Sequence, residues 1–418
     1  MTISSYPNLV YLDQVTGGNT IAFPPNGVDA FGRLRISQPI TLFDSSHRYA
    51  DNDLWAELTA GGGSSSFVAA EGLIDMDVGT ASGDSVIRET FKVFSYQPGK
   101  SLLTMNTFVM GEAKANLRQR VGYFNADNGI FLERDGTTVN FVKRSLVTGS
   151  ATDTKVAQAS WNGDKLDGTG PSKFTLDLEY AQIMWADIEW LGLGSVRVGF
   201  IINGKFIICH TFHHANLVTT TYITTASLPL RYEITNTDTT ASASKLKQVC
   251  STVISEGGYE LSGRQQAVGT VITSPYSLTT AGTYYPIVSL RLKSAREDAI
   301  AILTAASVLG VSSANYNWRV IARSTTTGGT WVSAGTNSSL EYNLTGTATT
   351  GGRILASGFF STTNQATGAI NLLKEALFKF QLERDSLNST YYEVSLVMSA
   401  GTSTSSVLAS LDWEEVSR

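Results

Sequence analysis

The sequence predicts an all-β protein with two antiparallel β-sandwich domains, jelly-roll-like in character, that follow an extended N-terminal arm. Short alternating apolar and polar runs are separated by turn residues, and the chain has 38 Gly and 10% aromatic residues. No heptad pattern and no long helical periodicity interrupts these runs. With 418 residues, and about 100–200 residues per domain, two or three domains are expected. The hydrophobic fraction of 42% suffices for buried cores.

The arm is predicted over residues 1–44. Gly17-Gly18-Asn19 and Phe23–Gly27 break the chain, so this segment cannot build a core of its own. Residues 28–36 and 40–43 still carry apolar side chains. We therefore expect a docking arm that lies over a neighbouring subunit, with a flexible tail as the alternative.

The first sandwich is predicted over residues 45–262. A hairpin with an Asn-Gly type turn is expected at 122–133, and a further strand at 137–143 extends it into a meander. Residues 195–209 form a second hairpin around Asn203-Gly204, and the alternation in 174–180 predicts a half-buried strand. Closing strands are expected at 228–235 and 246–255. Such spacing is typical of a jelly roll.

The second sandwich is predicted over residues 263–418, after the glycines at 257, 258 and 263. A single helical turn is expected at 370–377, directly before an alternating run. The expected strands are 284–293, 299–305, 318–323, 340–344, 378–382, 391–398 and 407–413.

Charge and composition narrow the function. The net charge of −5 gives no basic face for nucleic acid or anionic lipid. No apolar run approaches the roughly 20 residues of a membrane span, and the first residues lack the pattern of a signal peptide. Cys209 and Cys250 suit buried apolar positions, and a single disulfide between them stays open.

Histidines offer one candidate metal site. His210, His213 and His214 cluster in a strand that ends in a loop. Zinc needs three or four converging ligands, whereas neighbouring strand residues point to opposite faces. We therefore interpret the three as the polar end of a strand. No Gly-x-Ser-x-Gly elbow is present.

Carboxylate pairs and tryptophans are the remaining candidates. Three pairs stand two residues apart: Asp75/Asp77, Asp177/Glu179 and Asp187/Glu189. This spacing suits acid–base chemistry or calcium binding, and it equally suits the solvent face of a strand, which we favour. Trp161, Trp185 and Trp190 are candidate sugar-stacking aromatics, although strand tryptophans are more often core. No catalytic, cofactor-binding or metal-binding residue is therefore predicted.

Several blocks, in one order, give the sequence a likeness to a known family. They lie at 28–37, 41–44, 119–124, 161–172, 190–197 and 228–234, and the Trp161-Asn162-Gly163-Asp164 stretch is the most distinctive. Over residues 28–262 the chain resembles virion structural proteins of tailed bacteriophages. The resemblance implies a component of the phage particle and brings no catalytic residues.

The sequence thus predicts a non-enzymatic structural protein located in the virion, with no cofactor, and favours a tail-associated position at the baseplate, fibre or neck. Expected partners are other virion proteins and further copies of the chain, a trimer by analogy. One alternative is an attachment module whose second domain or Trp161 loop binds a host glycan. Another is a head decoration or head fibre. A glycan-degrading enzyme would need one of the Asp177/Glu179 or Asp187/Glu189 pairs.

Overall fold

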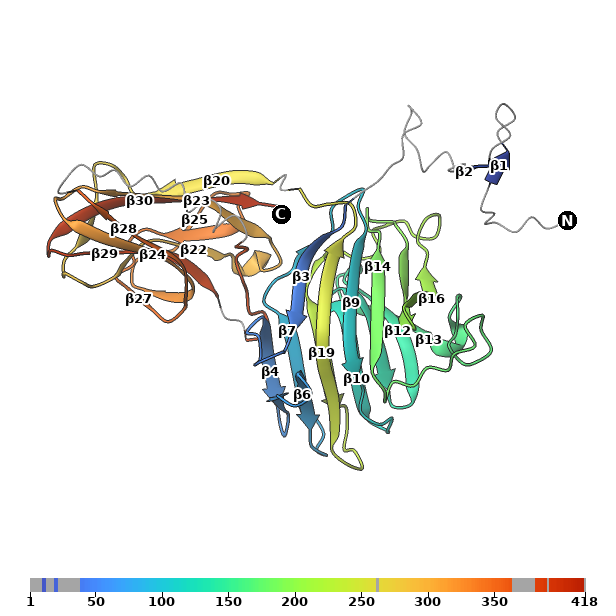
Figure 1. Cartoon of the computed structure of the whole chain (residues 1–418). Coiled ribbons are helices and arrows are strands. Elements are labelled where there is room, and N and C mark those ends of the chain that lie inside the picture. Colours follow the sequence, from blue (N-terminus) through green and yellow to red (C-terminus); the bar gives the residue numbers. More distant parts are fainter. Residues whose placement is uncertain are drawn as a thin grey trace.

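The computed structural model describes residues 10–12, 19–21, 38–260, 263–362, 380–388 and 391–416. It confirms the all-β class and the β-sandwich architecture. Figure 1 shows two β-rich bodies, one built around β9 and β19 and the other around β24 and β30. Within the described part of the chain, no helix is long and apolar enough to cross a membrane.

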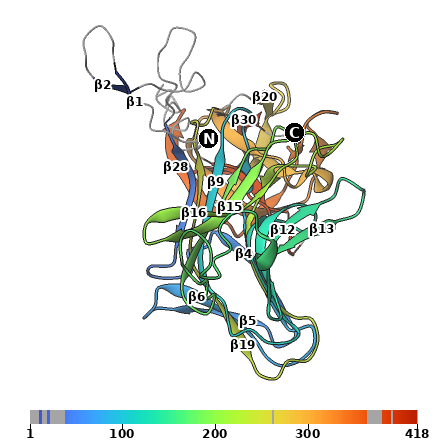
Figure 2. The ribbon, with the colours of Figure 1, turned by 90° about the vertical axis from the view of Figure 1, so that its right-hand side faces the viewer.

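The first sandwich packs a seven-stranded sheet against an eight-stranded sheet. Figure 2 shows these layers from the side, with β9 and β16 in one and β12 and β13 in the other. The seven-stranded sheet contains, in order, β13 (Thr152–Ala157), β12 (Thr138–Ser145), β11 (Gly129–Asp135), β10 (Leu117–Phe124), β18 (Leu230–Asn236), β7 (Ser85–Thr90) and β4 (Trp55–Ala60). The eight-stranded sheet contains β16 (Lys205–Phe212), β15 (Val196–Ile202), β14 (Gln182–Ile188), β9 (Leu102–Val109), β19 (Ser244–Ser255), β6 (Leu73–Val78) and β5 (Ser64–Val68), with β3 (Ile40–Ser46) also paired to β19.

Strict alternation explains why these segments form a sandwich. In β10, Val121 and Tyr123 are buried between the sheets, while Arg118 and Arg120 point outward. The same alternation places Leu230 and Tyr232 of β18 in the core. Each strand therefore contributes one apolar face to the core, and each sheet keeps one outer face.

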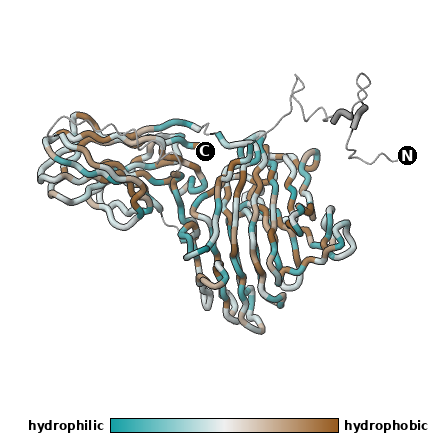
Figure 3. Tube along the Cα trace, in the orientation of Figure 1, coloured by the Kyte–Doolittle hydropathy of each residue, from teal (hydrophilic) through white to brown (hydrophobic). Residues whose placement is uncertain are grey.

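The second sandwich has its own apolar core. One sheet contains β20 (Arg264–Gly269), β30 (Ser405–Glu415) and β21 (Tyr276–Leu278), with β23 (Ala301–Gly310) paired to β30. The other contains β25 (Val332–Ser333), β26 (Leu340–Asn343), β22 (Tyr285–Leu292), β29 (Glu393–Ala400), β24 (Asn315–Thr327) and β27 (Ala348–Thr350), with β28 (Arg353–Ser361) paired to β24. Figure 3 shows hydrophobic stretches along the strands of both bodies.

Short elements complete the chain. They are β1 (Val10–Leu12) with β2 (Asn19–Ile21), β8 (Phe94–Ser95) with β17 (Ser227–Leu228), and the 3-10 turns η2 (Gln158–Ser160) and η3 (Ser294–Arg296).

The structure differs from the sequence predictions in three places. Residues 380–382, predicted as part of a strand at 378–382, form no strand, because Gln381 makes only an isolated bridge with Ile302. Residues 40–44, predicted as part of the arm, lie in β3 and pair with β19. Residues 174–180 form no strand, because their backbone bonds to two separate segments: Leu176 N to Leu166 O, and Met110 N to Leu178 O. Leu178 is nevertheless buried, so the apolar residues of this segment pack into the core from a loop and not from a strand. The helical turn at 370–377 and most of the arm lie outside the described residues.

The two sandwiches contact each other through more than their linker. Val93 of the first sandwich packs with Ile300 and Ile302 of the second. Arg323 Nη1 donates to Asp53 Oδ1 at 2.8 Å, and its guanidinium lies 3.9 Å from the Phe91 ring centroid. These contacts fix a groove between the two bodies.

A candidate ligand-binding groove between the sandwiches

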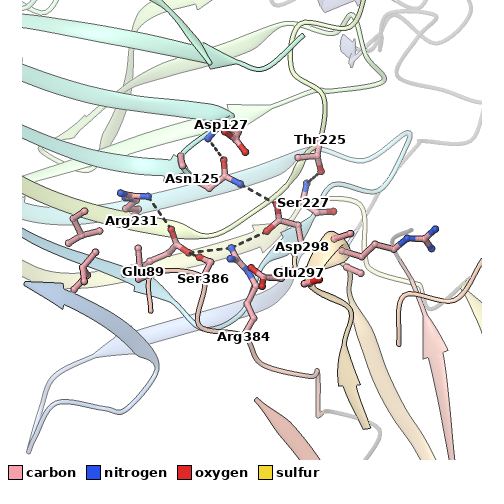
Figure 4. A pocket seen from close by; sticks show the side chains of 18 residues that line it. Glu89, Asn125, Asp127, Thr225, Ser227, Arg231, Glu297, Asp298, Arg384 and Ser386 are labelled. Carbon is pink, nitrogen blue, oxygen red and sulfur yellow. Dashed lines mark hydrogen bonds and ion pairs between the residues drawn. The ribbon is translucent and has the colours of Figure 1, made fainter. Parts of the chain in front are cut away.

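A polar groove of about 540 Å³ lies where the outer face of the seven-stranded sheet meets the second sandwich. Figure 4 shows its charged side chains, which come from both bodies. Glu89 on β7 and Arg231 on β18 occupy directly paired positions. Arg384 and Ser386 come from the segment 380–388, and Asp298 follows η3. The groove therefore depends on both sandwiches.

Glu89 is the centre of the hydrogen bonds in the groove. One carboxylate oxygen accepts from Ser386 Oγ at 2.7 Å and lies 3.3 Å from Arg384 Nη2. The other accepts from Arg231 Nη1 at 3.4 Å. Arg384 Nη2 also lies 3.1 Å from Asp298 Oδ1, and Asn125 Nδ2 donates to Asp298 Oδ2 at 3.2 Å. A continuous chain of polar contacts thus crosses from one sandwich to the other.

Two arginines of the groove carry a donor atom that has no hydrogen-bond partner among the described residues. Arg231 and Arg384 are 8% and 6% exposed, so both are more than nine-tenths buried. Their Nε atoms make no hydrogen bond among the described residues. An unsatisfied buried donor costs free energy. Both Nε atoms are closed to solvent, so a ligand in the groove would meet other polar atoms of its lining.

Burial shapes the acidity of the groove. It raises the pKa of Asp298, against the opposing effect of Arg384. Burial likewise raises the pKa of Glu297, which Arg384 again opposes. Asp127 lies at the exposed mouth of the groove.

The network of ion pairs continues from the groove across the outer face of the seven-stranded sheet. The register places Arg120 opposite both Glu133 and Glu233, and its guanidinium lies 2.8 Å and 3.3 Å from their respective carboxylates. Burial alone would raise the pKa of Glu233, but Arg231, Arg120 and Arg118 lower it overall. The lowered pKa favours the ionised form of Glu233, which these arginines hold in place.

A small aromatic cluster lies beneath this network of ion pairs. Phe124 and Phe131 stack with centroids 4.3 Å apart, and both are fully buried on the outer side of the sheet. The guanidinium groups of Arg120 and Arg144 lie 5.4 Å and 5.3 Å from the Phe131 ring centroid. These contacts hold the arginine side chains against the sheet.

The predicted histidine cluster does not form a metal site. His210 Nδ1 accepts from Asn162 N at 3.3 Å, whereas the His214 Nδ1 contacts Gly194 O at 2.6 Å and its ring stacks on Tyr222. Burial lowers the pKa of both His210 and His214. Among the described residues, no group of three or more His, Cys, Asp or Glu side chains is arranged to hold a metal ion.

The predicted carboxylate pairs have separate structural partners. Asp75 and Asp77 both contact Lys245. Asp177 Oδ1 accepts from Glu179 N within a turn. The third pair, Asp187 and Glu189, shares a hollow of about 590 Å³ with His213; there Asp187 pairs with Arg197 and accepts from Ser101.

Trp161 is not available to a sugar ring. Its side chain is 2% exposed, lies 4.5 Å from the Phe141 ring centroid and donates from Nε1 to Val156 O. Trp161 is therefore a core residue, as the favoured interpretation of the tryptophans held, and the alternative that its ring stacks on a sugar is wrong. Trp185 is also buried, and Trp190 packs on Tyr96. Cys209 and Cys250 are both free thiols. Cys209 is buried as predicted, whereas the prediction of a buried position is wrong for Cys250, which is exposed.

Sequence reasoning missed the groove residues. Arg231 and Glu233 do alternate with core residues in the printed sequence, so an outward polar face was detectable there. Arg384 and Asp298 belong to irregular segments, and no local pattern marks them as neighbours of Glu89.

Comparison with known proteins finds no matching family model. No curated protein matches the chain either. Similar solved structures include the carbohydrate recognition domain of Emp47p, at 10% identity and a TM-score of 0.33, covering 55% of this chain and 99% of that one. The CBM2 module of the evolved Dit of Lactobacillus casei BL23 phage J-1 has 9% identity and a TM-score of 0.35, over 54% and 100% of the respective chains. A legume lectin-like domain from Entamoeba histolytica has 11% identity and a TM-score of 0.31, over 52% and 99%. These are distant likenesses, and no conclusion about function follows from them.

Proposed function

We propose that this chain is a non-enzymatic component of a tailed bacteriophage particle and that its inter-sandwich groove binds a glycan of the host surface. The observation that carries the glycan part is the groove itself, which is lined by charged and polar side chains from both bodies, among them Arg231, Arg384 and Glu297. The virion part rests on the sequence resemblance over residues 28–262.

The groove suits a hydroxyl-rich ligand. Its volume of about 540 Å³ lies within the roughly 300–1,000 Å³ of small-ligand sites. A sugar hydroxyl both donates and accepts, so it can accept from Ser294 or Arg296 of the lining and donate to an Asp127 or Glu297 oxygen. The mixture of cations and anions favours a neutral or zwitterionic sugar over a polyanion.

The carboxylates support binding more than catalysis. Glu89 accepts from or pairs with Arg231, Arg384 and Ser386, so its oxygens are committed to structural contacts. A glycosidase pairs one carboxylic acid with one free carboxylate across the scissile bond. Glu133 and Glu233 are likewise neutralised by Arg120. This arrangement favours a fixed binding surface.

Glycan binding is tested by filling the groove. Ala295 is exposed on η3 and lines the groove without making an ion pair there, so Ala295→Trp inserts bulk and removes no charge. The control is Ala151→Trp, at an exposed alanine before β13. The full-length protein and both variants are applied to an array of bacterial surface polysaccharides, and hits are titrated by calorimetry. We expect at least a tenfold weaker affinity for Ala295→Trp and no change for Ala151→Trp. A wild-type protein that binds no polysaccharide, or equal binding by both variants, would contradict the proposal.

The proposed position of the protein in the phage particle is tested by a separate experiment. We favour a tail-associated position, at the baseplate, fibre or neck, with assembly through the N-terminal arm; the second candidate is a head decoration. Antibody labelling of intact particles in the electron microscope distinguishes tail from head. A chain that lacks residues 1–37, and so keeps β3 intact, should fold and fail to enter particles. Normal incorporation of that truncated chain would refute the docking arm.

A further inference from the structure

The outer face of the eight-stranded sheet is apolar at its centre, over β9, β14, β15 and β16, and carries the charged residues Asp75, Asp77 and Lys245 on β6 and β19. Its centre is a row of residues that the register sets side by side: Thr252 on β19, Met105 on β9, Trp185 on β14, Gly199 on β15 and Ile208 on β16. Figure 1 shows β19, β9 and β14 adjacent to one another. We call this surface the apolar face; it also includes Leu103, Ile183, Ile201, Phe206 and Ile254.

Gly199 is essential to the shape of the apolar face. A Cβ at this position would stand 1.8 Å from Ile207 O, at the bulge between β15 and β16. The missing side chain leaves room beside Trp185, whose ring meets Phe206 edge-on with centroids 5.4 Å apart. Trp185 is 3% exposed, so the open aromatic surface here is that of Phe206, which packs against Trp185.

The outermost members of the apolar face are open to solvent. Phe206 is 52% exposed and Ile208 is 41% exposed. Six strands from β3 to β16 span about 24 Å at the usual strand spacing, and Leu103 to Val109 spans about 20 Å along β9. Two such faces in contact would bury on the order of 1,000 Å² together, which is the lower bound for a specific protein interface.

The charges around the apolar face indicate what covers it. Its rim carries both signs: Asp44 on β3, the Asp187–Arg197 pair on β14 and β15, and Lys247 paired with Glu71. An anionic membrane surface would require a basic rim. A rim of mixed sign around an uncharged centre is complementary to itself, since a two-fold axis brings either charge near its opposite.

We infer that the apolar face is the interface between two copies of this chain, paired face to face about a two-fold axis. The groove of each copy adjoins the opposite sheet, so both grooves point away from the interface. The pair is therefore bivalent, and two grooves on one particle component raise the avidity for a repeating surface ligand. This inference stands independently of what the grooves bind.

The test is the mass of the full-length protein in solution. We expect a dimer of 44.9 kDa chains at micromolar concentration by sedimentation equilibrium, and at least a tenfold higher dissociation constant for Phe206→Asp. The control is Phe359→Asp, at a phenylalanine that is 83% exposed on β28 of the second sandwich. Circular dichroism checks that both variants remain folded. A wild-type monomer, a trimer, or an unchanged constant for Phe206→Asp would each overturn the inference, because face-to-face contact pairs copies in twos.

Cys250 gives a second, local readout. It is exposed and lies opposite Thr107 on the same side of the sheet, whereas Cys209 is buried. Alkylation of Cys250 should therefore slow at least severalfold as the protein concentration rises through the dissociation constant. A dimer that leaves this alkylation rate unchanged would place the interface elsewhere. Flotation of the monomeric protein with anionic lipid vesicles would favour a membrane and contradict the inference.

Discussion

Arg384 and Glu89 belong to different sandwiches, yet Arg384 Nη2 lies 3.3 Å from Glu89 Oε1. Both side chains are more than nine-tenths buried. The contact brings together residues almost 300 positions apart in the chain, as the neighbouring bond from Ser386 to Glu89 with a separation of 297 also does. This ion pair therefore contributes both to the groove and to the contact between the two bodies.

Arg384→Met should weaken the union of the sandwiches. It leaves Glu89 and Asp298 with one cation fewer in a buried setting, and loss of one partner from such a pair costs about 3–5 kcal/mol. We expect scanning calorimetry to resolve two unfolding transitions for the variant and a single cooperative one for the wild type. Arg296→Met is the control, because Arg296 donates to Asn337 O within the second sandwich. A single unchanged transition for Arg384→Met would show that other contacts couple the bodies.

Arg120→Met should be far more damaging than loss of a surface cation. Arg120 is 6% exposed and serves both Glu133 and Glu233, so its removal should lower the free energy of unfolding by about 3–5 kcal/mol. Lys247→Met removes the exposed pair with Glu71 and should cost about 0–1 kcal/mol. Urea denaturation of the two variants measures both losses of unfolding free energy. Equal losses would contradict the prediction that the buried ion pairs matter more than the exposed pair.

Tyr123→Phe should destabilise the first sandwich through hydrogen bonds alone. The Tyr123 hydroxyl contacts Phe94 O at 2.5 Å and Ala226 O at 2.7 Å, and it accepts from Leu228 N at 3.1 Å. Removing it leaves buried backbone groups without this partner, at a cost of about 1–3 kcal/mol. Tyr180→Phe, at a side chain that is 71% exposed, should be neutral in the same urea titration. Equal stability of the two variants would contradict this role of the hydroxyl.

His47 should make stability depend on pH below neutrality. Burial, together with the charge of Arg88, lowers the pKa of His47 from 6.5 to about 4, while Asp51 opposes the shift. Between pH 6.5 and pH 4, His47 is therefore protonated in the unfolded chain and neutral in the folded chain. The contribution of His47 to the free energy of unfolding is complete above pH 6.5 and falls as the pH drops towards 4. The loss attributable to this group is on the order of 3 kcal/mol.

His47→Gln isolates that contribution, because glutamine does not titrate. The wild type should lose more stability than the variant between pH 7 and pH 4.5 in urea titrations. Parallel pH profiles for the two proteins would rule out His47 as the source.

Much of the fold follows from local pattern. The hairpins at 122–133 and 195–209 were predictable because their turns contain Asn-Gly or a glycine with positive φ, as at Gly204 (φ 76°). The loop at 174–180 was mispredicted because alternation reports burial, and Leu178 is buried without belonging to a strand. Periodicity therefore locates core residues better than it locates strand pairing.

The candidate site was far less predictable. The alternation of Arg231 and Glu233 around Tyr232 marks an outward polar face, but it does not reveal that Arg120 lies opposite Glu233. That pairing depends on which strands become neighbours. Arg384 reaches Glu89 only because the chain returns from the second sandwich to the first, and tertiary contacts of this kind leave no local signature. Trp161 illustrates the opposite error: a tryptophan in a distinctive loop motif was considered as a binding residue, and it belongs to the core.

The return of residues 380–388 to the first sandwich has a consequence for the integrity of the chain. Gln381 Nε2 donates to Val93 O at 3.0 Å, and Asn388 Nδ2 donates to Glu57 O at 3.1 Å, so the second body is held by contacts that do not pass through the linker. A protease that cut between residues 260 and 263 would sever the covalent link and leave these contacts in place. The two fragments would then co-purify as one nicked protein until a denaturant separated them.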